Sequence, residues 1–536
     1  MMTMPQPVET ELKLEMPADQ AARLMRLPLL KKIAPEQSKT LLSVYFDTDK
    51  QTLRKSGLSL RIRSINGRHV QTIKQQGGHS IGLFERNEWE HAIGGRQPDF
   101  DAARGTALEP LLNKKLRRNL KPVFETRLCR TVYPIRKNGS EIELSVDMGQ
   151  VDAAGRSSPL CEVELELKNG EPKQLFDLAR TLGNHVAVQL ASRSKSEHGY
   201  ALLGSKQPGP VKSEPLALPR AADWASAFKI IARACLHQIV GNTVALQRQD
   251  SEALHQMRVG IRKLRAAISL FKDMLAGPQT EAIKAELKWI TAELGPAREL
   301  DVFVERVVKP VGQRKARGSG MEAVVKDFQD ERAGAIERAE EAVASARFRR
   351  LTLDIAASLE IGDWTRRKDK LRHTMRQRPV AAAAADELQR RSRKIRKEGA
   401  RLGKLDARRR HKLRIEAKKL RYACEFFADA FPGRKASRRR EKFIARLTEL
   451  QDTLGDLNDI MVHEGLAQRA IAGTNGRRGS RAGSGRGAQA ARKAQGAQQA
   501  FAAGRLSGRE EARFAPAMKL AERAVDRFAK ASPFWN

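Results

Sequence analysis

The chain has 536 residues, more than one hydrophobic core usually supports, so we expect two or three domains. Its 100 Lys+Arg residues against 63 Asp+Glu give a net charge of +37, which favours a polyanionic partner such as nucleic acid, an anionic membrane surface or a phosphate polymer. Four scattered cysteines exclude a disulfide framework, and the lack of a signal sequence or of about eighteen consecutive apolar residues predicts a cytoplasmic protein.

Short segments of alternating polarity dominate residues 5–204. Gly- and Asn-containing turns such as INGRH and KNGSE separate them, which is typical of antiparallel hairpins that close into a sheet or barrel. Helices are expected at 17–31 and 171–183. The predicted strands are ETELKLEM, LLSVYFD, LSLRIRS, HVQTIKQ, RNEWEHAI, PVFETRLCRTVYPI, EIELSVDMG and CEVELELK.

Nearly every predicted strand has one charged face and one apolar face. Because side chains alternate along a strand, Glu9, Glu11 and Lys13 share a face. An ordinary sheet with solvated charges would give this pattern. In a closed barrel with the charges inside, acidic strands could hold divalent cations and arginine strands could bind phosphate oxygens. The pattern alone leaves both interpretations open.

The motifs of the first half, in their order, resemble the CYTH domain of the triphosphate tunnel metalloenzymes over about residues 5–203. The matching segments are ETELK, YFDT, LRIR, TIK, RNEWE, SVD, EVELELK and SKSEHGY. The resemblance implies an eight-stranded antiparallel β-barrel with a charged lumen, and activity on triphosphates in the presence of Mg²⁺ or Mn²⁺. One departure is His198, which stands where the family often has arginine.

The same resemblance implies roles for the charges of the lumen. Metal coordination is expected from Glu9 and Glu11, with Asp147, Glu162, Glu164 and Glu166 as further candidates. Phosphate binding is expected from Lys13, Arg61, Arg63, Lys74, Arg86, Arg130 and Lys195. Activation of the attacking water is assigned to Glu88, Glu90 or Glu143. Arg127, whose strand phase is opposite to that of Arg130, is expected to point outward.

Beyond the first half the composition changes. Residues 205–220, SKQPGPVKSEPLALPR, contain four prolines and predict a linker. Residues 221–536 show apolar residues at helical spacing, and the chain beyond residue 200 holds +30 of the +37 net charge. Within this region, residues 473–500 are rich in Gly, Ala and Arg and predict a disordered loop.

The helical half contains an internal repeat. HQMRVGIRKLRAAISLF begins at His255, and HKLRIEAKKLRYACEFF begins 156 residues later at His411. Each copy is followed by a Leu-Gly element, around Gly295 and Gly455. Two copies predict two helical bundles of similar design, packed as a pseudo-symmetric pair.

Each copy carries a cationic stripe at positions i, i+3, i+7 and i+10 of a helix. The stripes are His255, Arg258, Arg262 and Arg265, and His411, Arg414, Lys418 and Arg421. Apolar residues about 120° away can pack the bundle. A solvated basic face would also give such a stripe, but its duplication favours binding. The histidines lack an HxxxH partner, which favours phosphate donors over metal ligands.

The stripe helices resemble the CHAD domain over about residues 220–536. This resemblance implies binding of inorganic polyphosphate in a basic cavity between two four-helix bundles. Nucleic acid is the rival polyanion, but no aromatic residues interleave the stripes for base stacking, and no RRM, KH or helix-turn-helix signature is present. We therefore favour phosphate polymers.

Together the two halves resemble bacterial CYTH-CHAD inorganic triphosphatases, with an α+β multidomain fold. The expected reaction is metal-dependent hydrolysis of tripolyphosphate to diphosphate and phosphate. Three alternatives stay open: hydrolysis of an organic triphosphate such as thiamine triphosphate or a nucleotide, cyclisation of ATP, and a non-enzymatic adaptor for polyphosphate granules. No membrane partner is expected, while association with polyphosphate granules is.

Overall fold

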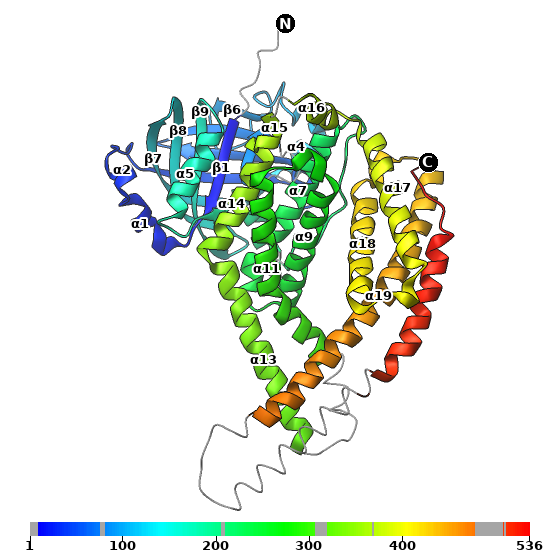
Figure 1. The fold of residues 1–536 in the computed structure, drawn as a ribbon. Coiled ribbons are helices and arrows are strands. Elements are labelled where there is room, and N and C mark those ends of the chain that lie inside the picture. Colours follow the sequence, from blue (N-terminus) through cyan, green and yellow to red (C-terminus); the bar gives the residue numbers. More distant parts are fainter. Residues whose placement is uncertain are drawn as a thin grey trace, which may run out of the picture.

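The N-terminal part of the chain folds into an antiparallel sheet and the remainder is helical (Figure 1). This division agrees with the sequence prediction. The computed structural model describes residues 9–75, 81–204, 209–305, 319–366, 369–476, 508 and 511–535. None of the helices in these ranges is long and apolar enough to cross a membrane.

The sheet has ten strands. They are β1 (Glu9–Glu15), β2 (Lys39–Asp47), β3 (Leu58–Ile65), β4 (Arg68–Gln75), β5 (Leu83–Arg86), β6 (Glu88–Ile93), β7 (Lys121–Lys137), β8 (Ser140–Ala153), β9 (Arg156–Asn169) and β10 (Gln189–Leu190). Each of the eight predicted segments overlaps at least one of them, and RNEWEHAI overlaps both β5, at Arg86, and β6. The two additional strands are β10, which pairs only two residues with β1, and β5, which is separated from β6 by Asn87.

The strands are connected in a ring. Their order is β10-β1-β9-β8-β7-β2-β3-β4-β6, and all pairs are antiparallel. β5 pairs with β1 and β6 pairs with β4, while a single residue, Asn87, lies between them. The continuous segment β5–β6 therefore joins the two ends of the strand order and encloses a tunnel.

Short helices flank the sheet. They are α1 (Ala21–Met25), α2 (Pro28–Lys31), α3 (Thr52–Lys55), α4 (Lys114–Asn119), α5 (Lys173–Gly183) and α6 (Lys195–Leu203). α5 confirms the helix predicted at 171–183. The helix predicted at 17–31 is confirmed in part: the segment is helical but interrupted, because Pro28 holds the preceding Leu27 in an extended conformation, so it divides into a 3₁₀ turn and two short helices.

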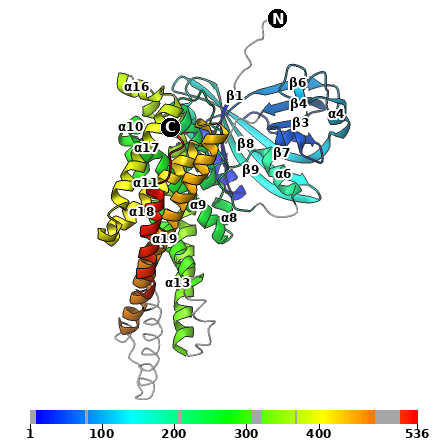
Figure 2. The same cartoon turned by 90° about the vertical axis from the view of Figure 1, so that its right-hand side faces the viewer.

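The apolar outer face of β1, β8 and β9 is buried against helices. Leu12, Leu144 and Leu165 belong to one core cluster with Leu178 of α5 and Ala356 of the helical half. Figure 2 shows these strands beside the helices, whereas β3, β4 and β6 lie on the remote side of the sheet. Because the outer face is covered in this way, the charged faces of β1, β8 and β9 point into the tunnel.

The helical half divides into two groups joined through α9 and α18 (Figure 1). The first contains α7 (Trp224–Val240), α8 (Thr243–Leu246), α9 (Ser251–Leu270), α10 (Lys272–Leu275), α11 (Pro278–Phe303), α13 (Ser319–Ala344) and α14 (Ala346–Ile361). α15 (Asp363–Arg366) and α16 (Lys370–Arg376) lead to the second, which contains α17 (Val380–Gly399), α18 (Ala407–Phe426), α19 (Arg434–Gly476) and a last helix at 511–529. The predicted loop at 473–500 starts too early, since α19 extends to Gly476; residues 477–500 lie outside the described residues.

The two repeat copies occupy equivalent places in the two groups. α9 and α18 carry the stripes, and α11 and α19 carry the Leu-Gly elements. A methyl group on Gly295 would lie 3.6 Å from Arg258 Nη1, and one on Gly455 would lie 3.8 Å from Arg414 Nε. In both copies the second stripe residue therefore lies over the glycine of the next helix, and a side chain larger than methyl would displace it.

Candidate functional site

Strand register assembles a carboxylate trio, Asp147, Glu162 and Glu164, on the inner face of β8 and β9. Asp147 lies opposite Glu162 across these two strands, and Lys13 of β1 lies opposite Glu164. All three carboxylates are buried. One carboxylate oxygen from each of the three residues lies within 4.8 Å of the corresponding oxygens of the other two. The trio can therefore offer three oxygen ligands to a single ion.

Three basic side chains, those of Arg130, Lys195 and Lys13, contact the carboxylate trio. Arg130 of β7 donates to both oxygens of Asp147, at 2.7 and 2.6 Å, and to Glu164 at 2.5 Å. Lys195, the first residue of α6, lies 2.8 Å from Asp147 and 2.9 Å from Glu164, and it also contacts Glu162. Lys13 lies 2.5 Å from Glu164. The charges at this site are thus nearly balanced.

The electrostatics differ within the trio. Burial opposes ionisation of Glu164, yet Lys13, Lys195 and Arg130 hold its pKa well below the ordinary value. For Glu162, burial prevails and raises the pKa, and its Oε2 atom is buried without a hydrogen-bond partner. Carboxylate oxygens are the ligands that Mg²⁺ and Mn²⁺ prefer. The trio therefore fits a divalent cation, which would compete with the neighbouring lysines for the same oxygens.

The other predicted metal ligands lie outside the trio. Glu11 is buried and pairs with Lys13 at 3.1 Å. Glu166 pairs with Lys168 at 2.6 Å. Burial and a hydrogen bond with Glu88 raise the pKa of Glu9 to about 8. Among the described residues, the only group with metal-ligand spacing is the trio, so the structure brings together three of the six candidates.

The three carboxylates expected to activate water have different surroundings. Glu88 lies 2.5 Å from Lys74 and 3.5 Å from Arg61; burial opposes its ionisation, but these cations hold its pKa low. Glu90 accepts a hydrogen bond from Thr72 at 2.9 Å and is half-exposed at its side chain. Glu143 lies 3.6 Å from Lys168, away from the arginines. Glu88 and Glu90 therefore lie next to the basic side of the tunnel, and Glu143 does not.

Three guanidinium groups, those of Arg61, Arg63 and Arg130, lie close together beside the carboxylate trio. Arg61, burial and Arg130 lower the pKa of Arg63 to about 10. The Nε atoms of Arg61 and Arg63 are buried without hydrogen-bond partners. An anion bound between the three guanidinium groups would relieve this crowding of like charge. Arg86 lies in β5, but its side chain is outside the described part of the chain.

Arg127 lies on the outer face of β7. Its side chain is 64% exposed and pairs with Glu125 at 2.5 Å. Sequence reasoning missed Tyr45, which forms a hydrogen bond with Arg61, and Thr72, which holds Glu90. Tyr45 and Thr72 each lie directly opposite Arg61 on a neighbouring strand, so they are on the same face of the sheet as the charged residues. The alternation that identified the arginines could therefore have identified these two hydroxyl groups as well.

The basic stripes of the two repeat copies face each other at their centres. Burial, Arg414 and Arg262 lower the pKa of Lys418 to about 7, which places side chains of both copies close together. Arg258 Nη1, Arg262 Nε and Arg414 Nε are buried without hydrogen-bond partners. Arg414 lies 3.6 Å from Asp459. Asp456, Asp459 and Glu299 lie near these four cations, but their attraction does not offset burial and mutual repulsion, since the pKa values of Arg258, Arg414 and Lys418 are lowered.

The side chains at the ends of the stripes have more hydrogen-bond partners than those at the centre. Arg265 donates to Thr291 at 3.1 Å, and Arg421 donates to Gln451 at 2.8 Å and to Glu425 at 2.9 Å. His411 is exposed and bonds to Asn458. The pKa of His255 is lowered by burial and by Arg298, a cation from the Leu-Gly element that sequence reasoning did not select.

Family models match both regions. A CYTH domain model matches residues 8–200, and a CHAD domain model matches residues 230–468. The chain carries a CYTH domain followed by a CHAD domain. The tunnel and its carboxylate trio belong to the CYTH domain, and both basic stripes belong to the CHAD domain.

Individual relatives cover parts of the chain. An inorganic triphosphatase from Haemophilus influenzae is 32% identical over 201 residues, which span 37% of this chain and 56% of that protein. The crystal structure of the CHAD domain from the plant Ricinus communis shows 29% identity over 59% of this chain and 96% of its own, with a TM-score of 0.47. A putative adenylyl cyclase from Hippeastrum with a dominant triphosphatase activity shows 20% identity over 38% and 98%, with a TM-score of 0.30.

Proposed function

We propose that the chain is a metal-dependent inorganic triphosphatase that hydrolyses tripolyphosphate to diphosphate and phosphate in the CYTH tunnel. The observation that carries the proposal is the carboxylate trio beside Arg130, with Arg61 and Arg63 on the neighbouring basic side. Oxygen ligands and guanidinium groups are the two partners that a metal-bound triphosphate needs. The relative named inorganic triphosphatase supports this substrate.

The residues of the tunnel would divide the work as follows. Arg61, Arg63 and Arg130 bind the phosphate oxygens, and Lys13 and Lys195 shift from the trio towards the substrate. The trio would hold Mg²⁺ or Mn²⁺, which neutralises phosphate charge and polarises the phosphoryl group. Water attacks a terminal phosphorus, the bond to the bridging oxygen breaks, and diphosphate leaves.

One proton must leave the attacking water. We assign its acceptor to Glu88 or Glu90, because both lie beside Arg61, at 3.5 and 3.7 Å, whereas Glu143 lies beside Lys168. Glu90 is the more exposed of the two and can pass the proton to solvent. This assignment selects two of the three carboxylates expected from the sequence.

We further propose that the CHAD domain binds inorganic polyphosphate at the centre of the two stripes. Arg258, Arg262, Arg414 and Lys418 are concentrated there, and three buried guanidinium nitrogens lack hydrogen-bond partners. A chain of phosphates supplies acceptors to all of them without a metal. Polyphosphate granules would present such chains to the domain.

A phosphate-release panel tests the proposal. The substrates are tripolyphosphate, longer polyphosphates, ATP and thiamine triphosphate, each with Mg²⁺, with Mn²⁺ and with a chelator. We expect the fastest release from tripolyphosphate and none with the chelator. Faster turnover of an organic triphosphate, or formation of cyclic AMP, would replace the proposed substrate. Binding of polyphosphate without turnover of any substrate would leave a granule adaptor.

A further inference from the structure

Tyr45 lies on the inner face of β2 and belongs to a stack of three aromatic rings. It lies directly opposite Arg61 of β3 on one side and Phe124 of β7 on the other. Its ring stacks on that of Phe124, with centroids 4.5 Å apart, and Phe124 meets Tyr200 of α6 edge to face at 5.0 Å. All three rings are buried. We call Tyr45, Phe124 and Tyr200 the aromatic stack; its end beside Arg61 is the phenol oxygen of Tyr45.

The aromatic stack is held in place from α6. A methyl group on Gly199 would lie 2.1 Å from the ring of Phe124, so this ring lies directly against the helix backbone. The hydroxyl of Tyr200 donates to Asp47 at 2.7 Å, and Asp47 also accepts from backbone N–H groups in the first turn of α3. Closely packed rings have little freedom to rotate, so the phenol oxygen of Tyr45 has a fixed position.

Two carboxylates near Arg61 lie beyond the usual hydrogen-bond distance. Its Nη2 atom is 3.5 Å from Glu88 and 3.7 Å from Glu90. Each carboxylate has a closer partner of its own, Lys74 at 2.5 Å and Thr72 at 2.9 Å respectively. The hydrogen bond to the aromatic stack is therefore the contact that fixes this guanidinium.

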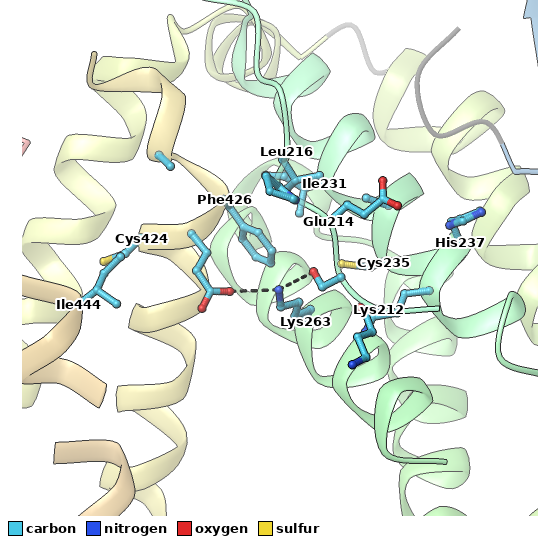
Figure 3. Close-up of a pocket in the computed structure, with 16 residues that line it drawn as sticks. Lys212, Glu214, Leu216, Ile231, Cys235, His237, Lys263, Cys424, Phe426 and Ile444 are labelled. Carbon is cyan, nitrogen blue, oxygen red and sulfur yellow. Dashed lines mark hydrogen bonds and ion pairs between the residues drawn. The ribbon is translucent and has the colours of Figure 1, made fainter. Parts of the chain in front are cut away.

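A cation of the CHAD domain shows another way of holding a positive charge inside the protein (Figure 3). Lys263 lines a pocket of about 350 Å³ between the two helical groups, where it lies 3.0 Å from Glu425 and donates to Ser213 at 2.7 Å. That carboxylate both positions the lysine and neutralises it. A hydroxyl group is an uncharged acceptor, so Tyr45 can position Arg61 without neutralising it.

We propose that Tyr45 is a positioning residue for Arg61 in the binding of a triphosphate. Its phenol oxygen accepts a hydrogen bond from the guanidinium and keeps it from turning towards Glu88 and Glu90. The remaining N–H donors of Arg61, among them a buried Nε without a partner, then stay available to phosphate oxygens. The inference rests on the proposed binding of a triphosphate in the tunnel.

Tyr45→Phe tests the proposal, because it removes the phenol oxygen and keeps the ring. Without that oxygen the guanidinium can pair with the nearby carboxylates, and a substrate must displace it from them. We expect metal-free binding of tripolyphosphate, measured by calorimetry, to weaken by about fivefold. KM should rise by the same factor while kcat changes by less than about twofold. Tyr133→Phe is the matched control, since Tyr133 is buried on the outer face of β7, and it should change neither binding nor kinetics.

A double variant distinguishes positioning from a structural role. In an Arg61→Ala background, Tyr45→Phe should weaken binding by less than about twofold, because the group that it positions is gone. Three outcomes would overturn the proposal: unchanged binding in Tyr45→Phe, a loss that is equally large with and without Arg61, and a Tyr45→Phe protein that does not fold.

The result for Tyr45 is separate from the result for the proposed function. Hydrolysis is judged on the wild type alone, whereas the role of Tyr45 is judged on the ratio of the binding constants of variant and wild type. If the wild type prefers another triphosphate, the same ratio is measured with that ligand. A wild type that binds no triphosphate would overturn both.

Discussion

Two lysines, one in each domain, show how differently the tunnel and the stripes are built: Lys195 is buried and Lys418 is half-buried. Lys195 lies among the carboxylate trio; burial opposes its charge, but Asp147 and Glu162 raise its pKa above the ordinary value. Lys418 lies among Arg414 and Arg262, which add to the effect of burial and lower its pKa to about 7. Around the carboxylate trio the tunnel compensates its cations with carboxylates, whereas the centre of the stripes places cations beside cations.

The difference matches two kinds of ligand. A triphosphate that arrives with a divalent metal brings charges of both signs, and a site that holds both carboxylates and cations can bind both parts by exchanging partners. A long polyphosphate carries only negative charge, and a site with an excess of cations gains most from it. Cations crowded together in a partly buried site destabilise the free protein. The CHAD domain thus carries a stability penalty that its ligand would remove.

The largest expected effect comes from inverting the charge at the centre of the stripes. Changing Arg258, Arg262, Arg414 and Lys418 to Glu should weaken polyphosphate binding by more than about 10³-fold, since four charged contacts are lost. Phosphate release from tripolyphosphate should remain near normal. Binding is measured by calorimetry at several salt concentrations, and the wild-type affinity should fall steeply with salt.

The control for this inversion places four glutamates on exposed helical surface. Its positions are Arg338, Arg390, Arg408 and Lys519. The net charge falls equally in both variants, but only the first alters the buried centre. Comparable losses in the two would mean that diffuse charge, and not a shaped site, holds the polymer.

A change of one ligand in the tunnel should have the next largest effect. Glu162→Gln keeps the shape of the side chain but removes its charge, and Lys195 keeps Asp147 and Glu164 as partners. We expect metal-dependent hydrolysis to fall by about 10²-fold or more, and the rise in melting temperature on adding Mg²⁺ or Mn²⁺ to disappear. Glu141→Gln, at an exposed position of β8, should leave both unchanged. A folded Glu162→Gln protein with normal rate would remove the trio from the mechanism.

A smaller effect is expected when an arginine inside the tunnel and one outside it are each changed to alanine and their KM values are compared. Arg61→Ala should raise KM for tripolyphosphate by about tenfold, because a buried guanidinium of the basic side is lost. Arg127→Ala should change KM by less than about twofold, because Arg127 lies outside the tunnel and pairs with Glu125. Steady-state kinetics on both variants measures these changes in KM. Similar changes in the two variants would contradict the conclusion that Arg61 faces the tunnel and Arg127 faces outward.

The sequence was sufficient for what depends on local alternation. The alternation of side chains with a period of two residues identified the inward-facing residues of β8 and β9, and helical spacing identified both stripes. Strand register is not a local property, so the sequence could not show that Asp147 lies opposite Glu162. Nor could it show that Glu166 lies two rows further along β9, opposite Glu143, and pairs with Lys168. Six residues with the right phase were therefore expected to bind metal, and three were brought together.

Packing between distant segments was likewise beyond the sequence. The repeat showed two equal stripes, but not that their centres meet, which depends on how α9 packs against α18. The ring of strands closes because β5 pairs with β1 and β6 pairs with β4, on either side of Asn87. The residues of this segment do not themselves indicate which strands they pair with. The pocket lined by β9, α6 and α8 needs walls from both domains, so no single motif predicted it.

The smallest effect concerns the pH dependence of the stripes and follows from Lys418. In the free protein its pKa is about 7, and a bound polyanion favours the charged form, so binding takes up a proton above that pH. Polyphosphate affinity should be constant below pH 7 and fall as the pH rises above 7, by up to about tenfold per unit. His255, whose pKa is lowered from 6.5, is already neutral in this window.

Stability should move in the opposite direction over the same range. Between pH 7 and the ordinary lysine value of 10.5, the unfolded chain holds a proton that the folded chain has lost, so the free energy of unfolding rises with pH. Lys418→Arg keeps its charge and should bind with little pH dependence, while Lys418→Met should stabilise the free protein by about 1–4 kcal/mol. Calorimetry and thermal unfolding of the three proteins between pH 6 and 9 measure both slopes. An affinity that rises with pH in the wild type, or an unchanged slope in Lys418→Arg, would show that Lys418 is not the group that titrates.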